Sequence, residues 1–439
     1  MNNENSTTPN VQLPSTVRIA GLVPGLHVAK ASEDLTSEQV AANRKLINKP
    51  VAERHDIVFL FDCAKSNPNG DPDTGNMPRV QPDSLKGLVT DVCQKRKVRN
   101  FFSLYNPDGT PRPDRSTALG YQIFIRENAV LQESMESPEI ETLARKIFAE
   151  ELEQKPEAWD AKGKKKGGKG KQTEKAGQEQ PDEPEKEEVS PADDFKKQAY
   201  RAALLRTFFD LRAFGGVIST KGPLKGSFYG QIRGPIQFTF AESLDKILQL
   251  DATITRCAVA SVEEKEKLQK EQDDESGGNR TMGRKHGIDY GVYRCHIHFS
   301  PAFAAKTGFT YYDLDNFLFA LENMFRDDPA SGRFLRVVGL VDFQHQSALG
   351  NAPAHKLFNL VDVRSRTETK DGKPVFRSSG SEFPRSLEDY EGTPPADEYH
   401  VTKAGEVKAG MNGEGVAVIK AKRLVWEIPA LPKSASPAE

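Results

Sequence analysis

The chain contains little cysteine. Its four cysteines are scattered over 439 residues, and no two of them form a C-x-x-C pair. This excludes a disulfide scaffold and a zinc ribbon, which need paired cysteines. The sequence has no apolar run near the roughly 20 residues that cross a bilayer. The first residues, MNNENSTTPN, lack the basic and apolar regions of a signal peptide. We therefore expect a cytoplasmic protein with no membrane partner.

The chain also lacks an excess of charge of either sign. It has 61 Lys and Arg residues against 63 Asp and Glu residues, a formal net charge of −2. This excludes a globally cationic, histone-like protein, but a local basic surface is enough for phosphate contacts. Hydrophobic residues make up only 37% of the chain. Because this share is low for a compact chain of such length, part of the protein is predicted to be disordered.

Composition divides the chain into a folded core and additions. Between Trp159 and Val189 the only hydrophobic residues are two alanines, while lysines and then acids crowd the segment. Such a block cannot bury enough apolar surface to offset its ordering entropy. The predicted parts are a flexible or docking N-terminal extension (1–54), a core (55–363) interrupted by a disordered charged insertion (158–192), a polar loop segment (364–410), and a C-terminal strand and tail (411–439).

Hydrophobic periodicity predicts an α+β fold with a central antiparallel sheet. Strands and helices follow one another in an order for which an RRM-like or ferredoxin-like core is the commonest solution. The expected strands cover about 57–61, 120–126, 232–241, 252–262, 290–299, 335–344 and 415–428, with a short helix or turn at 242–248. The expected helices cover about 84–101, with Asp83 as N-cap, 137–155, 191–213 and 311–326.

A basic segment spans the first of these helices. Lys86 is placed in its first turn, where Ser84, Lys86 and free backbone N–H groups would together hold a phosphate. The alternative is a solvated basic helix face. The cations of this candidate site are Arg79, Lys86, Lys95, Arg96, Lys97 and Arg99.

The loop before this helix alternates Asn67, Asn69, Asp71 and Asp73, like the start of a calcium loop. The glycine at position six and the glutamate at position twelve of an EF-hand are missing in either register. A structural turn is therefore favoured over a metal site.

Two glycine-rich segments are further candidates. Arg284, Lys285 and His286 follow Gly283 and are expected at the tip of an extended loop, where they would reach phosphates; a plain surface loop is the alternative. The other segment runs from Phe214 to Thr220, and its glycines suit either a polyanion or tight helix–strand packing. Its candidate residues are Phe214, Gly215, Gly216 and Ser219, with Arg233 further along the chain.

Other reactive residues lack partners in the sequence. His296 and His298 would share one face of a strand, but no third metal ligand is identifiable, so core or edge histidines are the favoured interpretation. Cys63 has no visible base and is predicted to be a buried strand cysteine.

Four long motifs carry a resemblance over most of 55–363. They are HDIVFLFDCAKSNPNGDPDTGNMPRV, GLVTDVCQKRKVRNFF, MGRKHGIDYGVYRCHIHFSP and ALGNAPAHKLF, in that order. The chain resembles the CRISPR-associated, RAMP-type backbone subunit of the type I-C Cascade effector. The related type I-B subunit shares something like the first motif, whereas the last two point to type I-C.

The resemblance implies a non-catalytic protein without a cofactor that coats guide RNA. It implies an RRM-like palm, a thumb hairpin at about 260–288, and finger and web insertions. Implied partners are guide RNA, target DNA, further copies of the chain, and the guide-processing, large and small Cascade subunits. Base pairing by the guide would supply the sequence specificity. The alternative is a metal-dependent RNase that uses Asp71 or Asp73, as in type III relatives.

Overall fold

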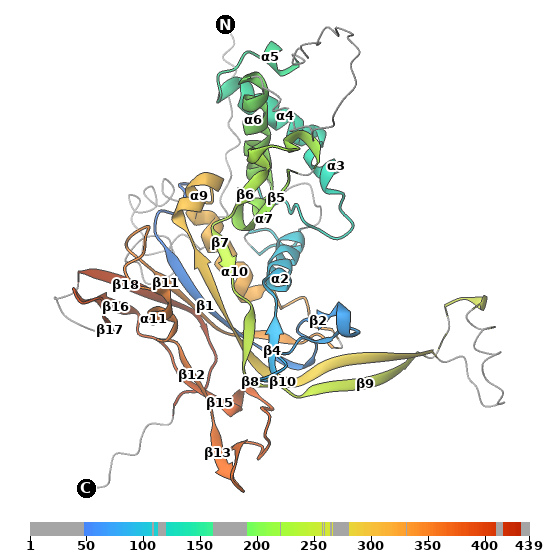
Figure 1. The fold of residues 1–439 in the computed structure, drawn as a ribbon, viewed down its shortest axis with the longest axis vertical. Helices are drawn as coiled ribbons and strands as arrows, with labels where there is room; N and C mark the ends of the chain where they lie inside the picture. The colour runs from blue at the N-terminus through green and yellow to red at the C-terminus, as the bar shows by residue number, and fades with distance from the viewer. Residues whose placement is uncertain are drawn as a thin grey trace, which may run out of the picture. The chain divides into compact units, whose positions relative to one another are not determined.

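The computed structural model describes residues 48–431 apart from 108, 113–119, 161–190, 220, 257, 259, 264–265, 267–280, 331 and 410–415 (Figure 1). Most of the predicted N-terminal extension and of the charged insertion therefore lies outside the described residues. The chain divides into two compact units: unit 1 comprises Met1–Pro111 and Pro235–Glu439, and unit 2 comprises Arg112–Gly234. Among the described helices, none is long and apolar enough to cross a membrane.

Unit 1 is built on a ten-stranded sheet in which the neighbouring strands pair antiparallel. This confirms the predicted mixed fold with a central antiparallel sheet. The strands run in the order β17 (Val407–Ala409), β16 (Glu398–Val401), β18 (Ala417–Trp426), β11 (Leu335–Gln344), β1 (His55–Ser66), β10 (Thr281–Phe299), β8 (Ala241–Lys246) and β4 (Lys86–Val89), while β7 (Ile236–Phe238) and β9 (Gln249–Arg256) also pair with β10.

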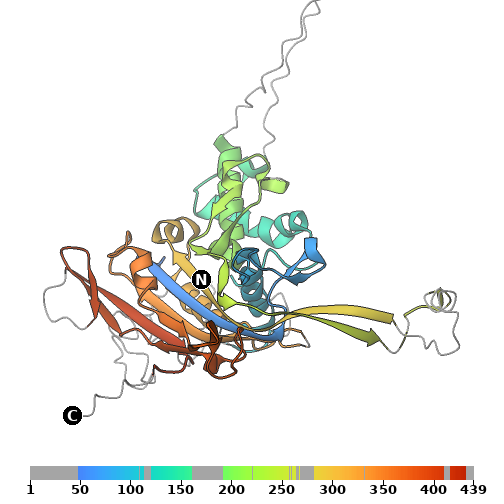
Figure 2. The same ribbon diagram turned by 60° about the horizontal axis from the view of Figure 1, so that its bottom comes forward.

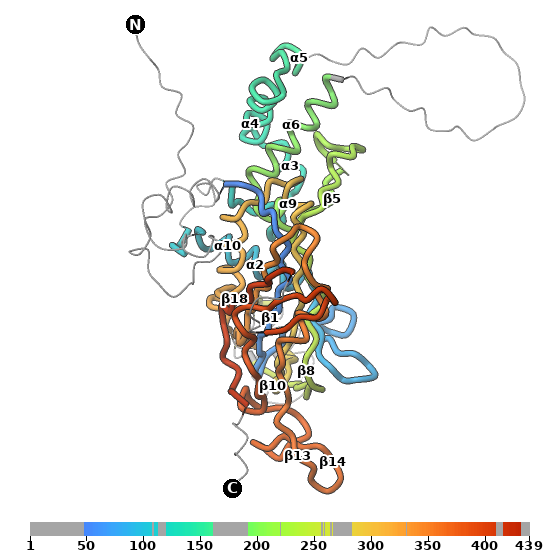
Figure 3. The backbone as a smooth tube through the Cα atoms, turned by 90° about the vertical axis from the view of Figure 1, so that its left-hand side faces the viewer, coloured from blue at the N-terminus to red at the C-terminus, as the bar shows by residue number. Residues whose placement is uncertain are grey.

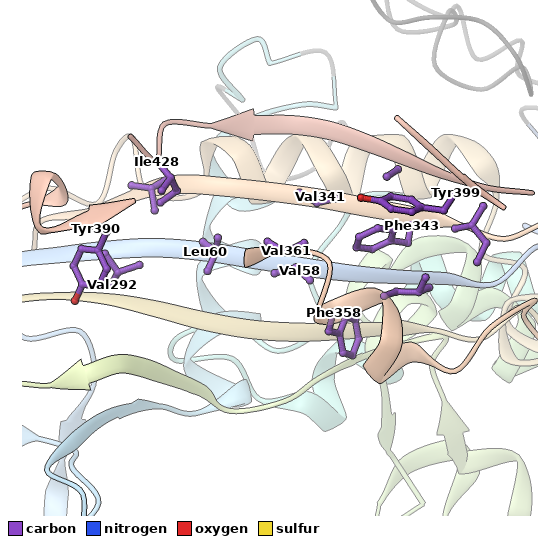
Figure 4. Close-up of a cluster of buried hydrophobic side chains, with 14 of the residues drawn as sticks. Val58, Leu60, Val292, Val341, Phe343, Phe358, Val361, Tyr390, Tyr399 and Ile428 are labelled. Carbon is purple, nitrogen blue, oxygen red and sulfur yellow. The ribbon is translucent and has the colours of Figure 1, made fainter. Parts of the chain in front are cut away.

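The central strand β1 is apolar on both faces because both are covered. Successive strand residues point to opposite faces, so Val58 and Leu60 enter one hydrophobic cluster, shown in Figure 4. Phe59 and Phe61 point the other way and pack against Phe325, with ring centroids 6.3 and 5.5 Å apart. The continuous apolar run that predicted a doubly buried strand is therefore confirmed.

Helices α2 (Asp91–Leu104) and α10 (Tyr311–Asn323) contact each other, and α10 contacts β11. Phe317 of α10 packs edge-on against Phe238 of β7 at 6.0 Å. A capping box at Thr310 and Asp313 fixes the start of α10. The short helix α9 (Pro301–Thr307) follows β10 directly.

The segment 364–410 is predicted to be loop-like, but the structure folds it into short strands. Three of these strands place large side chains in the interior, among them Phe376, Tyr390 and Tyr399, next to exposed or half-buried residues. Such short amphipathic runs are masked by the polar composition around them. The strands are β12 (Asp362–Ser365), β13 (Thr367–Lys370), β14 (Lys373–Phe376), β15 (Tyr390–Thr393), β16 and β17, with α11 (Ala354–Phe358) before them. Figure 3 labels β13 and β14.

Unit 2 is mainly helical. Its elements are α3 (Leu131–Met135), α4 (Pro138–Glu150), α5 (Glu157–Asp160), α6 (Pro191–Thr207), α7 (Phe209–Phe214), β5 (Gly215–Val217) and β6 (Gln231–Arg233). The predicted helix at 137–155 is confirmed as α4. The helix expected over 191–213 is broken at Phe208 into α6 and α7. Trp159 of α5 is buried against Phe148, at 5.2 Å, so ordered structure extends past the predicted start of the insertion at 158.

Two predicted elements are wrong. Residues 120–126 form no strand; there, an isolated bridge joins Gln122 to Phe208. Buried Asp210 instead accepts the backbone N–H groups of Phe124 and Ile125, at 2.8 and 3.1 Å, so these groups need no strand partner. The turn or helix expected at 242–248 is mostly strand β8, because β10 and β4 pair with it on either side.

Candidate nucleic-acid interface

A two-stranded hairpin extends from the sheet of unit 1 (Figures 1 and 2). Its strands β9 and β10 pair in register from Arg256 opposite Thr281 to Gln249 opposite Ile288. Arg284, Lys285 and His286 lie within this paired ribbon, not at a loop tip as predicted. The strand expected at 290–299 begins earlier, because β10 continues through 281–288 by pairing with β9.

The three basic residues of the hairpin have different surroundings. Arg284 is 74% exposed and lies 3.5 Å from Asp251, a long and solvent-screened pair that leaves its guanidinium accessible. His286 is largely buried, with Nδ1 3.3 Å from the same carboxylate. The stem of Lys285 lies against Gly332, where an added Cβ would come within 2.5 Å of the lysine Cε. Arg284 therefore has the most accessible side chain of the three.

The loop before Arg79 is a hydrogen-bonded turn. The side-chain oxygen of Asn69 accepts from both the N–H and the hydroxyl of Thr90, each at 3.0 Å. Asp71 accepts the N–H of Asp73 and lies 3.4 Å from Arg79. These contacts support the structural-turn interpretation. No group of three or more potential metal-ligating side chains is found within the described part of the chain.

Lys86 does not begin a helix. Leu85 has φ of 56°, and Lys86 starts strand β4, where it lies 3.1 Å from Glu242. Helix α2 begins at Asp91 and is capped by Thr90, whose hydroxyl accepts the N–H of Cys93. Ser84 instead donates to Gln81 in the preceding turn, at 2.7 Å. The predicted helix start with Asp83 as N-cap is therefore wrong, and a phosphate contact by Ser84 or Lys86 stays a prediction.

The cations of α2 point in several directions. Lys95 pairs with Asp91 at 2.8 Å, and Lys97 pairs with Asp328. Arg99 is buried, whereas Arg96 is exposed. Because Lys95 and Lys97 are paired with acids and Arg99 lies in the interior, α2 does not present its cations as one basic face.

The candidate residues of unit 2 form a tight strand pair. Gly215 has φ of 75°, and an added Cβ would lie 2.3 Å from the carbonyl oxygen of Ile232 on β6. Phe214 is buried, and the Ser219 carbonyl accepts the N–H of Gly226 at 2.8 Å. Gly216 pairs with Ile232, while Arg233 is exposed. The packing explanation of these glycines is supported; an RNA contact by this segment stays a prediction.

Sequence reasoning missed three cations anchored on buried acids. Arg336 binds Asp62 at 2.6 Å, and Lys65 and Arg385 both bind Asp289. The signal was present, since a lone acid within an apolar strand must find a cationic or hydrogen-bonding partner. Burial, followed by the nearby Asp62 carboxylate, raises the pKa of Tyr290, whose hydroxyl donates to Asp62 at 2.8 Å.

The two strand histidines have structural surroundings. His296 stacks on Phe358 with ring centroids 4.1 Å apart, and burial lowers the pKa of His296 to about 4. His298 bonds Asp56 at 2.8 Å. Cys63 is fully buried, and burial raises its pKa to about 12. These findings support the predictions of core or edge histidines and of a buried strand cysteine, with the His298 side chain 37% exposed.

Comparisons with known proteins agree on one family. The sequence model of a family described as CRISPR-associated protein Cas7 matches residues 53–393. A Haloferax volcanii protein described as CRISPR-associated protein Cas7 is 43% identical over 47 residues, 11% of this chain. That match spans 14% of the relative's own length.

Two solved structures are also similar to parts of the chain. A chain of a "CRISPR RNA-guided surveillance complex, pre-nicking" has a TM-score of 0.35 and 14% identity, covering 66% of this chain and 78% of that one. A chain of a "CRISPR RNA-guided surveillance complex" has a TM-score of 0.27 and 10% identity, covering 66% and 68%.

Proposed function

Since this chain belongs to the CRISPR-associated Cas7 family, we propose that it is a non-catalytic backbone subunit of a type I-C Cascade complex that coats guide RNA. The motifs MGRKHGIDYGVYRCHIHFSP and ALGNAPAHKLF support the subtype. The partners in this proposal are guide RNA, target DNA, further copies of the chain and the other Cascade subunits.

The observation that carries the proposal is the hairpin β9–β10 within the family match. A paired ribbon that leaves the sheet and exposes Arg284 can reach along a phosphate backbone. We assign the predicted thumb, about 260–288, to the second strand of this hairpin and the connection before it. The parts 1–54, 158–192, 364–410 and 411–439 are assigned to additions around the core 55–363.

We also infer an RRM-like palm. The strand order β11-β1-β10-β8 is antiparallel throughout, with α2 in the connection after β1 and α10 in the connection after β10. If these four strands are numbered by their order in the chain, their order across the sheet is 4-1-3-2. This is the strand order of a split β-α-β fold. The order supports the proposal for the centre of the sheet, to which β16, β17 and β18 are added at one edge.

The contacts of Asp71 argue against the alternative, a metal-dependent RNase. Its carboxylate accepts the N–H of Asp73 and lies beside Arg79, so the geometry gives it a capping role. RNA cleavage that needs Mg²⁺ and disappears in Asp71→Ala or Asp73→Ala would establish the RNase instead.

Salt dependence tests the hairpin contact. Arg284→Ala should weaken binding to every guide sequence alike, by roughly tenfold, because phosphate contacts carry no base information. The slope of log affinity against log salt should fall by about 0.7. Lys86→Ala should have a smaller effect, because Lys86 is already paired with Glu242. The measurement is RNA affinity across a salt series.

The control for this series is Lys164→Ala in the lysine-rich run 162–175. If Arg284→Ala keeps the wild-type affinity and slope, the RNA does not follow the hairpin. An equal loss in Lys164→Ala would show that binding is diffuse charge attraction.

Guide RNA should convert the protein into an ordered polymer. Backbone contacts between identical subunits arranged head to tail are heterologous and do not close. Light scattering and electron microscopy should show stacked arcs whose length follows that of the RNA. A strictly monomeric complex at saturating RNA would contradict this arrangement.

A further inference from the structure

Phe334 is an exposed aromatic residue immediately before β11. Half of it, 51%, is accessible, and no ring contact to it is found among the described residues. Arg333 before it and Arg336 two residues after it are exposed cations, while the adjacent Leu335 is buried. The buried Leu335 fixes the strand while Phe334 remains at the surface.

The backbone beneath Phe334 is held by strand β1. The Phe334 carbonyl accepts the N–H of Ala64 at 3.2 Å and the hydroxyl of Ser66 at 3.0 Å. Two residues earlier, the Gly332 carbonyl accepts the N–H of Asn67 at 3.0 Å. These bonds hold the ring on the sheet framework, so a partner that packs on it meets a preorganised surface.

Two cations lie close to Phe334 along the paired strands β1 and β11. Lys65 follows Ala64 on β1 and is 72% exposed, and Arg336 is 47% exposed. The closest carboxylates to these cations, Asp289 and Asp62, are buried, and Arg336 has a second, longer contact of 3.9 Å with the exposed Glu427. Gly332, with φ of 84°, also gives room for the stem of Lys285 from the hairpin.

We propose that Phe334, flanked by Lys65 and Arg336, is a stacking platform for a base of single-stranded RNA. An exposed ring offers its face to any base, and anchored cations offer charge to the phosphates on either side. This combination suits a single strand, because the bases of a duplex are already stacked and cannot lie on the ring. The inference rests on the proposed function for the identity of the strand, the guide RNA.

Replacing the ring while keeping its bulk tests the platform. Phe334→Leu should lower the affinity of the full chain for a mixed-sequence single-stranded RNA by about 5- to 100-fold. Phe334→Trp should keep wild-type affinity, because it keeps a flat ring. The salt slope of Phe334→Leu should be unchanged, whereas Arg336→Ala and Lys65→Ala should each reduce it by about 0.7.

Three comparisons sharpen this test. An abasic ribose-phosphate chain of the same length should bind the wild type and Phe334→Leu equally, because it has nothing to stack. Phe240→Leu, which changes a similarly exposed ring (55%), should bind RNA as the wild type does. If Phe334→Leu unfolds at the same temperature as the wild type, its loss of RNA affinity comes from the missing contact and not from a less stable fold.

Each failure has its own result. If the wild type does not bind RNA, the proposed function fails. If the wild type binds and Phe334→Leu binds equally well, the platform fails while the function stands. If Phe334→Leu loses affinity only for single-stranded DNA of the same sequence, the platform belongs to a DNA strand and the RNA assignment is overturned.

Discussion

Replacing Asp56 by alanine is expected to lower the free energy of unfolding by about 3–5 kcal/mol, the usual cost of removing one partner from a buried charged network. The Asp56 side chain is fully buried on β1. It accepts from Arg54 at 2.9 Å, from His298 at 2.8 Å and from His345 at 3.0 Å. Nδ1 of His345 accepts the N–H of Asn351, so Nε2 carries the hydrogen donated to Asp56. Without the carboxylate, His345 is left with a buried, unpaired donor.

This contribution should depend on pH. Burial alone would raise the pKa of Asp56, but the hydrogen bonds from His298, His345 and Arg54, together with the charge of Arg54, hold that pKa well below its ordinary value of 3.8. The unfolded chain therefore takes up a proton first as the pH falls. The stabilisation is complete above about pH 5 and is lost at lower pH, by up to about 1.4 kcal/mol per pH unit.

Urea unfolding from pH 7 to pH 3 measures this directly. The difference in stability between the wild type and Asp56→Ala should be largest at neutral pH and should narrow in acid. Asp397→Ala is the control, because Asp397 is exposed and its pair with Arg423 should contribute less than about 1 kcal/mol. A constant difference across the pH range would show that the Asp56 carboxylate is not the source of the stabilisation.

Asp210→Ala should destabilise unit 2 by about 2–5 kcal/mol. The buried carboxylate accepts two backbone N–H groups of the 120–126 segment, and each buried donor left unsatisfied costs roughly 1–3 kcal/mol. Amide hydrogen exchange should accelerate at Phe124 and Ile125 first, and then across the helices of unit 2. The exposed Asp160, paired with Arg145, supplies the control variant Asp160→Ala. Unchanged exchange at Phe124 and Ile125 would mean that this segment is held by other contacts.

The sequence predicts elements best where local pattern and tertiary environment agree. The apolar run of β1 and the stretch 335–344 of β11 are buried by neighbours on both sides, so hydrophobicity alone identifies them. The start of β10 was missed because its residues Gly283 to His286 are polar and gain their strand structure only from pairing with β9. For residues 120–126 the error is the opposite, because a strand is predicted and none forms. Asp210, distant in the sequence, accepts the backbone N–H groups of Phe124 and Ile125.

The candidate site shows the same division. The sequence identifies the lysine and arginine residues of the candidate site directly. It does not identify which acidic residues form ion pairs with them. Lys97 is paired with Asp328, more than two hundred residues away, and Arg336 with Asp62. An ion pair over such a separation depends on how the helices and strands pack in the folded chain. The exposure of a side chain depends on the same packing. The accessible side chains of Phe334 and Lys65 are therefore identified only from the structure.

Strand β10 pairs with several strands along its length, among them β9 over 281–288 and β1 over 288–299. Because side chains alternate between faces, one residue gained or lost within this strand would turn every following side chain to the wrong face. Evolution can therefore change the length of β10 only by an even step or by adding a bulge. Families of this architecture should therefore keep the spacing from Gly287 to Phe299 constant.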